Sequence, residues 1–277
     1  SSYSINQSSG ILPLPNTLTD SLVSPKSIAI STNNQSVSVA PYGDSSLSMY
    51  SIDQSTGALS YLGTVTAGCC NSPINNANQI TVDPKGQYVY LVGLTTGATH
   101  IGEIFMFTIN SNGTLTPKNG LIMSNGGSNS PTSVAASKTA KFIYSLMKQG
   151  NDSSTGKNVV LSTIASNGYL TTGKSLQVNS GGEAPSSIAI SPNGKFAYIT
   201  NSASNNIATY GIQSSGQLTY LSAVPTAITP SSLVIDPTGE YVYVTNSGSN
   251  NTTIYGIDQS NGNLTQLYQN IATGSNP

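Results

Sequence analysis

Short runs of alternating hydrophobic and polar residues recur along the whole chain. Aromatic and β-branched residues are frequent within these runs, and clusters of Gly, Pro, Asn and Ser separate one run from the next. A polarity that alternates every second residue is typical of a β-strand with one buried face, whereas an α-helix repeats its apolar positions every three or four residues. The pattern therefore predicts an all-β protein whose strands are joined by tight turns.

The predicted strands come in groups of four, and the group that starts at Pro185 shows the arrangement. A short apolar first strand ends in a Pro-x-Gly turn at Pro192–Gly194, and Phe196–Ile199 alternates as the second strand. An Asn/Ser loop precedes the third strand, Thr209–Ile212, and a Gly turn precedes the fourth at Leu218. Pro presets the backbone of such turns, and Gly supplies their left-handed residue.

This group of four strands repeats along the chain. The stretch from Pro230 matches the stretch from Pro185 at a period of 45 residues, and earlier copies match more loosely. Equivalent first-strand residues are Ile28, Ile80, Val134, Ile188 and Leu233, at steps of 52, 54, 54 and 45. Four antiparallel strands in each repeat are typical of a β-propeller blade, and a single blade cannot bury both of its faces. We therefore predict a β-propeller with five complete four-stranded blades.

Residues 1–24 match only the second half of a blade. SSYSINQSSGILPL at the start of the chain aligns with ATYGIQSSGQLTYL at 208–221, which contains the third and fourth strands. We predict a single propeller domain that consists of this half-blade hairpin, 1–24, and a five-blade body, 25–277. The hydrophobic positions of the hairpin, which are candidates for an assembly contact, are Tyr3, Ile5, Ile11, Leu12 and Leu14.

Three explanations account for the two strands that the half-blade lacks. The native chain extends further, or a neighbouring copy supplies strands that pair with the hairpin, or the ring stays open. Unpaired strand edges are rare in native proteins, and the addition of a strand in trans is a known mode of recognition. Head-to-tail pairing of this kind would produce a closed ring or an open filament.

Two short motifs carry a family resemblance. YITN at 198–201 and YVTN at 243–246 resemble the signature of YVTN-repeat propellers. The frame SIAISPNGKFAY…IATYGI…SSGQLTYL is also similar to the lactonase-type seven-bladed propellers related to 6-phosphogluconolactonase. The resemblance covers almost the whole chain and implies the propeller fold. No catalytic motif of that family can be placed on these positions, and repeats of this kind specify architecture rather than chemistry.

The chain carries few charges, with 7% charged residues and a net charge of −1. Its nine basic residues are all Lys and are scattered, whereas nucleic-acid binding needs a concentrated basic stripe. No apolar run approaches the roughly 20 residues of a membrane span. We therefore predict neither nucleic-acid binding nor a membrane span, and the neutral Ser/Thr/Asn-rich surface favours an extracellular or cell-surface location.

Few residues offer catalytic or metal-binding chemistry. His100 is the only His and lies close to Glu103, but a zinc site needs three or four ligands, so we interpret the two as unrelated loop residues. Asp83 and Asp236 precede Pro in the turn after a first strand, where a carboxylate caps the backbone. Asp53 and Asp258 begin the turn between the third and fourth strands and have the same interpretation. We predict no catalytic residue, no metal and no cofactor.

The only two cysteines, Cys69 and Cys70, are adjacent in TAGCCNSP. In an oxidising compartment they would form a vicinal disulfide, which is strained because neighbouring Cα atoms lie only about 3.8 Å apart. Two free thiols, or bonds to another chain, are the alternatives.

These observations predict a non-catalytic structural propeller that assembles head to tail through its half-blade, with itself as the main partner. The absence of Arg and the single His argue against an enzyme. One alternative is a monomeric module that binds a glycan or a surface protein at one mouth of the ring. The other is a lactonase-like hydrolase.

Overall fold

The computed structural model describes residues 24–42, 45–66, 68–69, 72–95, 102–122, 130–148, 159–171, 181–275 and 277. Within these ranges the chain forms 21 β-strands and no helix. The strands of the first two sheets are β1 (Pro25–Ile30), β2 (Ser36–Pro41), β3 (Ser46–Ile52), β4 (Leu59–Thr66), β5 (Gly68–Cys69), β6 (Ser72–Val82), β7 (Tyr88–Thr95), β8 (Gly102–Ile109) and β9 (Leu115–Ile122). Those of the other three are β10 (Ser130–Ala136), β11 (Phe142–Lys148), β12 (Val159–Ile164), β13 (Leu170–Thr171), β14 (Pro185–Ile190), β15 (Phe196–Asn201), β16 (Asn206–Ile212), β17 (Leu218–Pro225), β18 (Pro230–Ile235), β19 (Tyr241–Asn246), β20 (Asn251–Ile257) and β21 (Leu264–Ala272).

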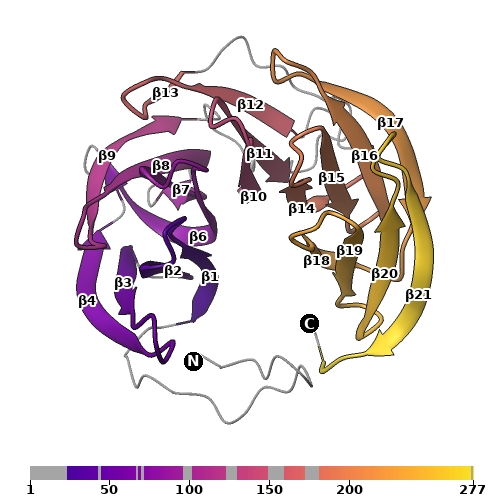
Figure 1. Ribbon diagram of the computed structural model, residues 1–277, viewed down its shortest axis with the longest axis horizontal. Helices are drawn as coiled ribbons and strands as arrows, with labels where there is room; N and C mark the ends of the chain where they lie inside the picture. The colour runs from indigo at the N-terminus through magenta and orange to yellow at the C-terminus, as the bar shows by residue number, and fades with distance from the viewer. Residues whose placement is uncertain are drawn as a thin grey trace.

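The strands form five antiparallel sheets that stand around a common centre as propeller blades (Figure 1). Blades 1, 3, 4 and 5 pair four strands in chain order, as in β1-β2-β3-β4, and blade 2 adds the short β5 beside β6. The first strands β1, β6, β10, β14 and β18 form the inner ring, and each contacts the next along the chain. The prediction of a β-propeller with four-stranded blades is confirmed. Residues 1–23, and with them the predicted half-blade, lie outside the described residues.

The turn after each inner strand is held by a side chain at its first position. Asp83 accepts a hydrogen bond from the backbone N–H of Tyr88 at 2.6 Å, and Asp236 accepts one from Tyr241 at 2.7 Å. The interpretation of these two aspartates as turn caps is therefore confirmed. Serine hydroxyls accept the equivalent bond in the other blades, at Ser31, Ser137 and Ser191.

The turn between the third and fourth strands is capped in the same way. Asp53 Oδ1 accepts hydrogen bonds from the hydroxyl of Ser55 at 2.6 Å and from the backbone N–H of Thr56 at 2.8 Å. These bonds, led by the one from the Ser55 hydroxyl, lower the pKa of Asp53 to about 2. Bonds from Ser260 likewise lower the pKa of Asp258. Both aspartates therefore have the structural role that was predicted for them.

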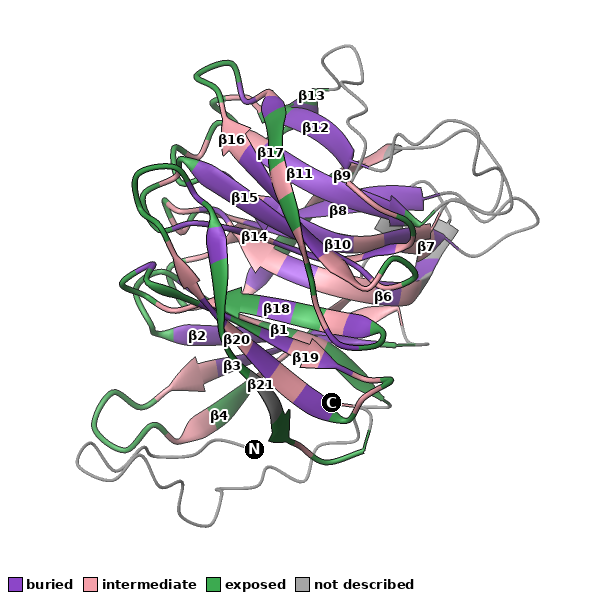
Figure 2. Cartoon of the chain, turned by 90° about the vertical axis from the view of Figure 1, so that its right-hand side faces the viewer, coloured by how far each residue is buried: buried purple, intermediate pink, exposed green. Residues whose placement is uncertain are grey.

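The hydrophobic core lies between neighbouring blades, where strands bury their middle residues (Figure 2). Tyr198 of β15 is fully buried, and its hydroxyl donates a hydrogen bond to the Gly262 carbonyl of the next blade at 3.0 Å. Burial raises the pKa of Tyr198 above the usual value. The same bond joins the earlier blades, in the pairs Tyr144–Gly216 at 2.8 Å and Tyr90–Gly168 at 3.1 Å.

The two blades at the ends of the described ring expose residues that other blades bury. Ile28 of β1 is 61% exposed, whereas the equivalent Ile188 of β14 is buried in the cluster that joins blades 3 and 4. Tyr243 of β19 is 37% exposed, although its equivalent Tyr198 is fully buried. The difference follows from the position of these blades in the ring, because the residue types themselves are unchanged.

Candidate functional site

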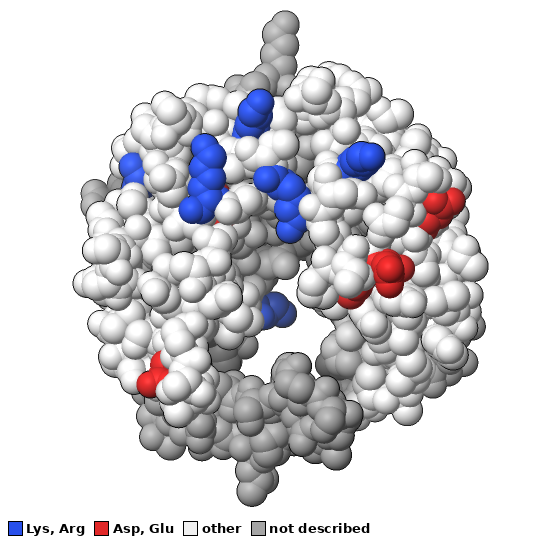
Figure 3. Space-filling model, viewed as in Figure 1, with Lys and Arg blue, Asp and Glu red and all other residues white. Residues whose placement is uncertain are grey.

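Each inner strand carries a β-bulge at the same position of the repeat, which is the second residue of the strand in blades 1, 4 and 5, the third in blade 3 and the seventh of the longer β6 in blade 2. The pairing register shifts there in all five blades, and the residue at the shift is polar in each: Lys26, Asn78, Thr132, Ser186 and Ser231. Bulges re-aim side chains and are frequent beside active sites. The five residues, here named the bulge ring, occupy equivalent positions of the inner strands and so lie at the same end of their blades, around the central opening of the ring (Figure 3).

Hydrogen bonds tie the bulge ring to neighbouring blades. Four of its side chains donate to the carbonyl of a proline 44 to 53 residues further along the chain: Asn78 to Pro131 (2.6 Å), Thr132 to Pro185 (3.0 Å), Ser186 to Pro230 (2.7 Å) and Ser231 to Pro277 (2.8 Å). A hydroxyl that donates one bond still has lone pairs with which to accept another. The ring is therefore held in place by the fold and keeps acceptors for a bound molecule.

Lys26 is the exception in the bulge ring. It is the only member with a charge, and its Nζ lies 5.9 Å from the centroid of the Tyr42 ring, at cation–π distance. Tyr42 is itself held by a bond from its N–H to the Ser24 carbonyl at 2.8 Å and by a bridge to Asn76. Lys26 is exposed, so its ammonium group can reach a molecule at the channel mouth.

Glu103 lies at the same end of its blade, as the second residue of β8. Its side chain is 3% exposed and lies against Gly120, where any larger side chain would meet the carboxylate. Blades 4 and 5 place asparagines at the equivalent position, and these accept hydrogen bonds from other asparagines, in the pairs Asn201–Asn206 at 2.8 Å and Asn246–Asn251 at 3.0 Å. Blade 2 therefore has a buried carboxylate, that of Glu103, at the position where blades 4 and 5 have a neutral amide.

Most residues that the sequence singled out fall outside the described ranges. These are His100, Cys70 and the hairpin positions Tyr3, Ile5, Ile11, Leu12 and Leu14. Cys69 lies in β5, where it pairs in register with Ser72, and the vicinal disulfide stays a prediction. The bulge ring was missed, although a polar residue follows the first Pro of a repeat in PKS, PTS and PSS.

The described residues show neither a metal-binding cluster nor a membrane-spanning helix. No group of three or more His, Cys, Asp or Glu within them could hold a metal ion. None of their elements is a helix long and apolar enough to cross a membrane. The predicted extracellular location and the predicted partners, a second copy, a glycan or a surface protein, stay predictions.

The fold is shared with solved structures of low sequence identity. A protein provisionally named 6-phosphogluconolactonase from Bacteroides uniformis is 20% identical, with a TM-score of 0.78, and the match covers 98% of this chain and 78% of that one. The periplasmic gluconolactonase of Pseudomonas aeruginosa is 14% identical, with a TM-score of 0.61 and coverage of 98% and 92%. A functionally unknown protein from Desulfotomaculum acetoxidans is 19% identical, with a TM-score of 0.71 and coverage of 93% and 72%. No curated protein matches the chain.

One family model matches almost the whole chain. The model of the family described as "Lactonase, 7-bladed beta-propeller" matches residues 1–276. This match contradicts the predicted role as a non-catalytic, self-assembling structural propeller, and it contradicts the prediction that the chain is not an enzyme. The prediction failed because it treated missing Arg as missing catalysis, whereas Arg is needed to clamp an anionic group and not to hydrolyse a neutral ester. The chain belongs to the lactonase family of seven-bladed β-propellers.

Proposed function

We propose that this protein hydrolyses an uncharged sugar lactone at the bulge-ring end of its channel. Family membership supports a lactonase, and two of the structural neighbours bear the names of lactone hydrolases. The observation that carries the proposal is Lys26, the one charged member of the bulge ring, whose other four members have hydroxyl or amide side chains. Such a lining suits a substrate that has many hydroxyl groups and one reactive carbonyl.

Lactone hydrolysis begins when water adds to the ring carbonyl carbon. The carbonyl carbon becomes tetrahedral, its oxygen becomes an oxyanion, and the attacking water loses a proton. The bond from that carbon to the ring oxygen then breaks, and the ring oxygen takes up the proton that the water lost, which gives a hydroxy acid. Positioned donors that face the developing oxyanion lower the barrier of such reactions. In this proposal the Lys26 ammonium group supplies the donor, and the Tyr42 ring limits its freedom.

The bulge ring also favours an unphosphorylated substrate. Phosphate groups are bound by Arg or by clusters of cations, and the chain contains no Arg. Among the described bulge-ring residues, Lys26 alone is charged, and a phosphate would compete with the oxyanion for it. The hydroxyls of Thr132 and Ser186 can accept hydrogen bonds from sugar hydroxyls instead.

The test is hydrolysis of glucono-1,5-lactone, followed in a pH-stat and corrected for the spontaneous reaction. We expect Lys26→Met to lower kcat/KM by about 10²–10³-fold, the usual loss for one oxyanion donor. Lys195→Met is the matched control, because Lys195 is exposed in the turn after β14 at the other end of its blade. It should leave kcat/KM within about twofold.

Two results would overturn the proposal. Wild-type protein that does not exceed the spontaneous rate would refute hydrolysis of neutral lactones. A clear preference for the 6-phosphorylated lactone would refute the inferred substrate class, while the loss in Lys26→Met would still locate the site.

A further inference from the structure

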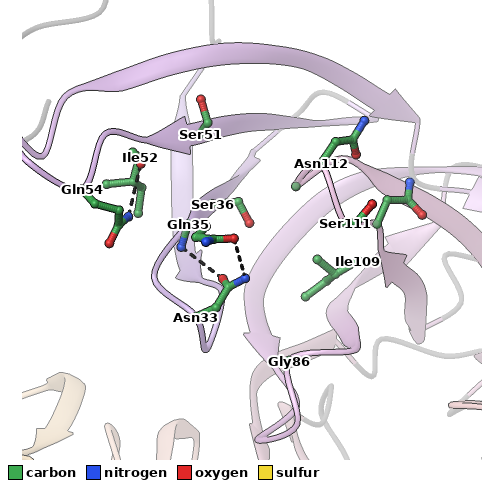
Figure 4. Close-up of a pocket in the computed structure, with 12 residues that line it drawn as sticks. Asn33, Gln35, Ser36, Ser51, Ile52, Gln54, Gly86, Ile109, Ser111 and Asn112 are labelled. Carbon is green, nitrogen blue, oxygen red and sulfur yellow. Dashed lines mark hydrogen bonds between the residues drawn. The ribbon is translucent and has the colours of Figure 1, made fainter.

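A hollow of about 420 Å³ lies between blades 1 and 2, at the end of the blades opposite the bulge ring (Figure 4). Two turns of blade 1 and two turns of blade 2 enclose it. Its volume lies within the roughly 300–1,000 Å³ of small-molecule sites. The side chains that line it include Asn33, Gln35, Ser36, Gln54, Ser111 and Asn112.

One aromatic ring of the repeat is missing beside the hollow. The first residue of the second strand is Tyr88, Phe142 or Phe196 in blades 2 to 4, and each ring packs on the turn glycine of the next blade. These glycines are Gly168, Gly216 and Gly262. In blade 1 the equivalent residue is Ser36, and its much smaller side chain faces Gly113 together with Leu62. Ser36 and Gly113 both line the hollow, which therefore lies where the other three blades have an aromatic ring.

The polar groups around the hollow alternate between donors and acceptors. Asn33 Nδ2 donates to Gln35 Oε1 at 3.0 Å, which directs the Gln35 amide and leaves its Nε2 as a donor. Gln54 Nε2 donates to the Asn34 carbonyl at 2.6 Å, which leaves its Oε1 as an acceptor. Asn112 Oδ1 accepts from Thr114 at 2.7 Å, which leaves its Nδ2 as a donor. These bonds orient the three amides, and Figure 4 shows the one between Asn33 and Gln35.

We propose that this hollow binds a neutral saccharide of one or two rings. Its lining carries no charged side chain, so an anionic or cationic ligand would lose its hydration without gaining an ion pair. Sugar hydroxyls donate and accept at once and so match the mixture of amides and hydroxyls. Ile52 and Ile109 supply apolar surface for the C–H groups of a sugar ring. The site is distinct from the channel end at which lactone hydrolysis is proposed.

The decisive variant is Ser36→Phe, which restores the ring that the chain itself uses at Phe142 and Phe196. The ring fits the equivalent place in blades 3 and 4, whereas here Leu62 must move away from Gly113 to admit it. The midpoint of thermal unfolding is therefore measured first, and it should stay within about 5 °C of the wild-type value. Binding of D-glucose, maltose and cellobiose to the full chain is measured by saturation-transfer NMR and calorimetry. We expect the affinity of the best of the three to fall about tenfold or more, as the volume is filled.

Three further measurements make the result specific. Gln54→Ala removes one acceptor without filling the hollow, and we expect roughly threefold to tenfold weaker binding. Glucose 6-phosphate should bind more weakly than glucose, because no cation lines the hollow. Hydrolysis of glucono-1,5-lactone should be unchanged in Ser36→Phe, since Ser36 lies away from the bulge ring.

The proposal is wrong if none of the three neutral sugars binds the wild type at millimolar concentrations. It is equally wrong if Ser36→Phe and the wild type bind with the same affinity, because the sugar would then occupy another place. Loss of sugar binding together with loss of lactone hydrolysis would also overturn it, since the sugar would then be reporting the channel site.

Discussion

The hydrogen bond between Tyr198 and Gly262 allows the contribution of one blade contact to be measured. Tyr198→Phe keeps the buried ring and removes only the hydroxyl, which lies 3.0 Å from the Gly262 carbonyl. No cavity is created beyond one oxygen atom, so the large penalty of core truncation does not apply. The variant loses the net value of the bond, about 0.5–1.5 kcal/mol, and leaves the carbonyl short of a partner, which brings the total to about 1–2 kcal/mol.

The repeat supplies a matched control at Tyr243. This residue occupies the same place in blade 5, but its side chain is 37% exposed. Tyr243→Phe should therefore change the free energy of unfolding by less than about 0.5 kcal/mol, the usual range for surface substitutions. The pair of variants differs only in whether a neighbouring blade covers the hydroxyl.

Urea unfolding followed by circular dichroism at 218 nm, a standard wavelength for sheet, measures both variants. With a slope of about 3 kcal/mol per molar urea, a loss of 1.5 kcal/mol moves the midpoint by about 0.5 M. Equal midpoint shifts in Tyr198→Phe and Tyr243→Phe would refute the reasoning, because the effect would then be independent of the blade contact. A Tyr198→Phe midpoint that equals the wild type would do the same.

Three further predictions concern pH and turns. Burial raises the pKa of the interface tyrosines, so their contribution to stability is complete below about pH 10 and is lost as the pH rises further; the urea midpoint should fall from pH 9 to pH 11. The pKa of Asp53 is lowered to about 2, so its contribution is present above the usual value of 3.8 and is lost as the pH falls towards 2; Asp53→Asn should lower the midpoint at pH 6 and have little effect at pH 2. Gly262→Ala places a methyl group 2.5 Å from the Phe196 ring, whereas Gly57→Ala meets nothing within 4 Å. A left-handed alanine costs each variant about 1 kcal/mol, and Gly262→Ala adds the close contact with the Phe196 ring. Calorimetry should therefore show a clearly lower midpoint of thermal unfolding for Gly262→Ala than for Gly57→Ala.

The fold was predictable because its signals are local. Strand alternation, the Pro-x-Gly turns and the caps at Asp83 and Asp53 each involve residues a few positions apart, and such patterns can be read without knowing what packs where. The period of the repeat then fixed the number of strands in a blade. The five described blades agree with that reading.

The function was mispredicted because composition says little about geometry. The missing Arg and the single His describe which charges the chain lacks, but they do not define the geometry of a site. In the sequence, Lys26 is only the second residue of the stretch PKSIAIS at the start of a repeat. The strand pairing of the structure shows that this position is a β-bulge in every blade. Glu103 likewise looked like a loop residue, and the structure places it in a strand with 3% exposure.

By itself, the sequence determined that this chain forms strands, where its turns lie and that four strands make a blade, because these properties depend on neighbours along the chain. Only the tertiary structure decided what happens between blades. Ser36 and Leu62 face Gly113 across an interface beside a hollow, whereas Phe196 packs on Gly262 at the equivalent interface. Tyr198 is buried and Tyr243 is exposed, although the two repeats have the same residue at this position. Contacts between residues far apart in the chain depend on which surface the ring brings opposite each side chain, and no local pattern encodes that.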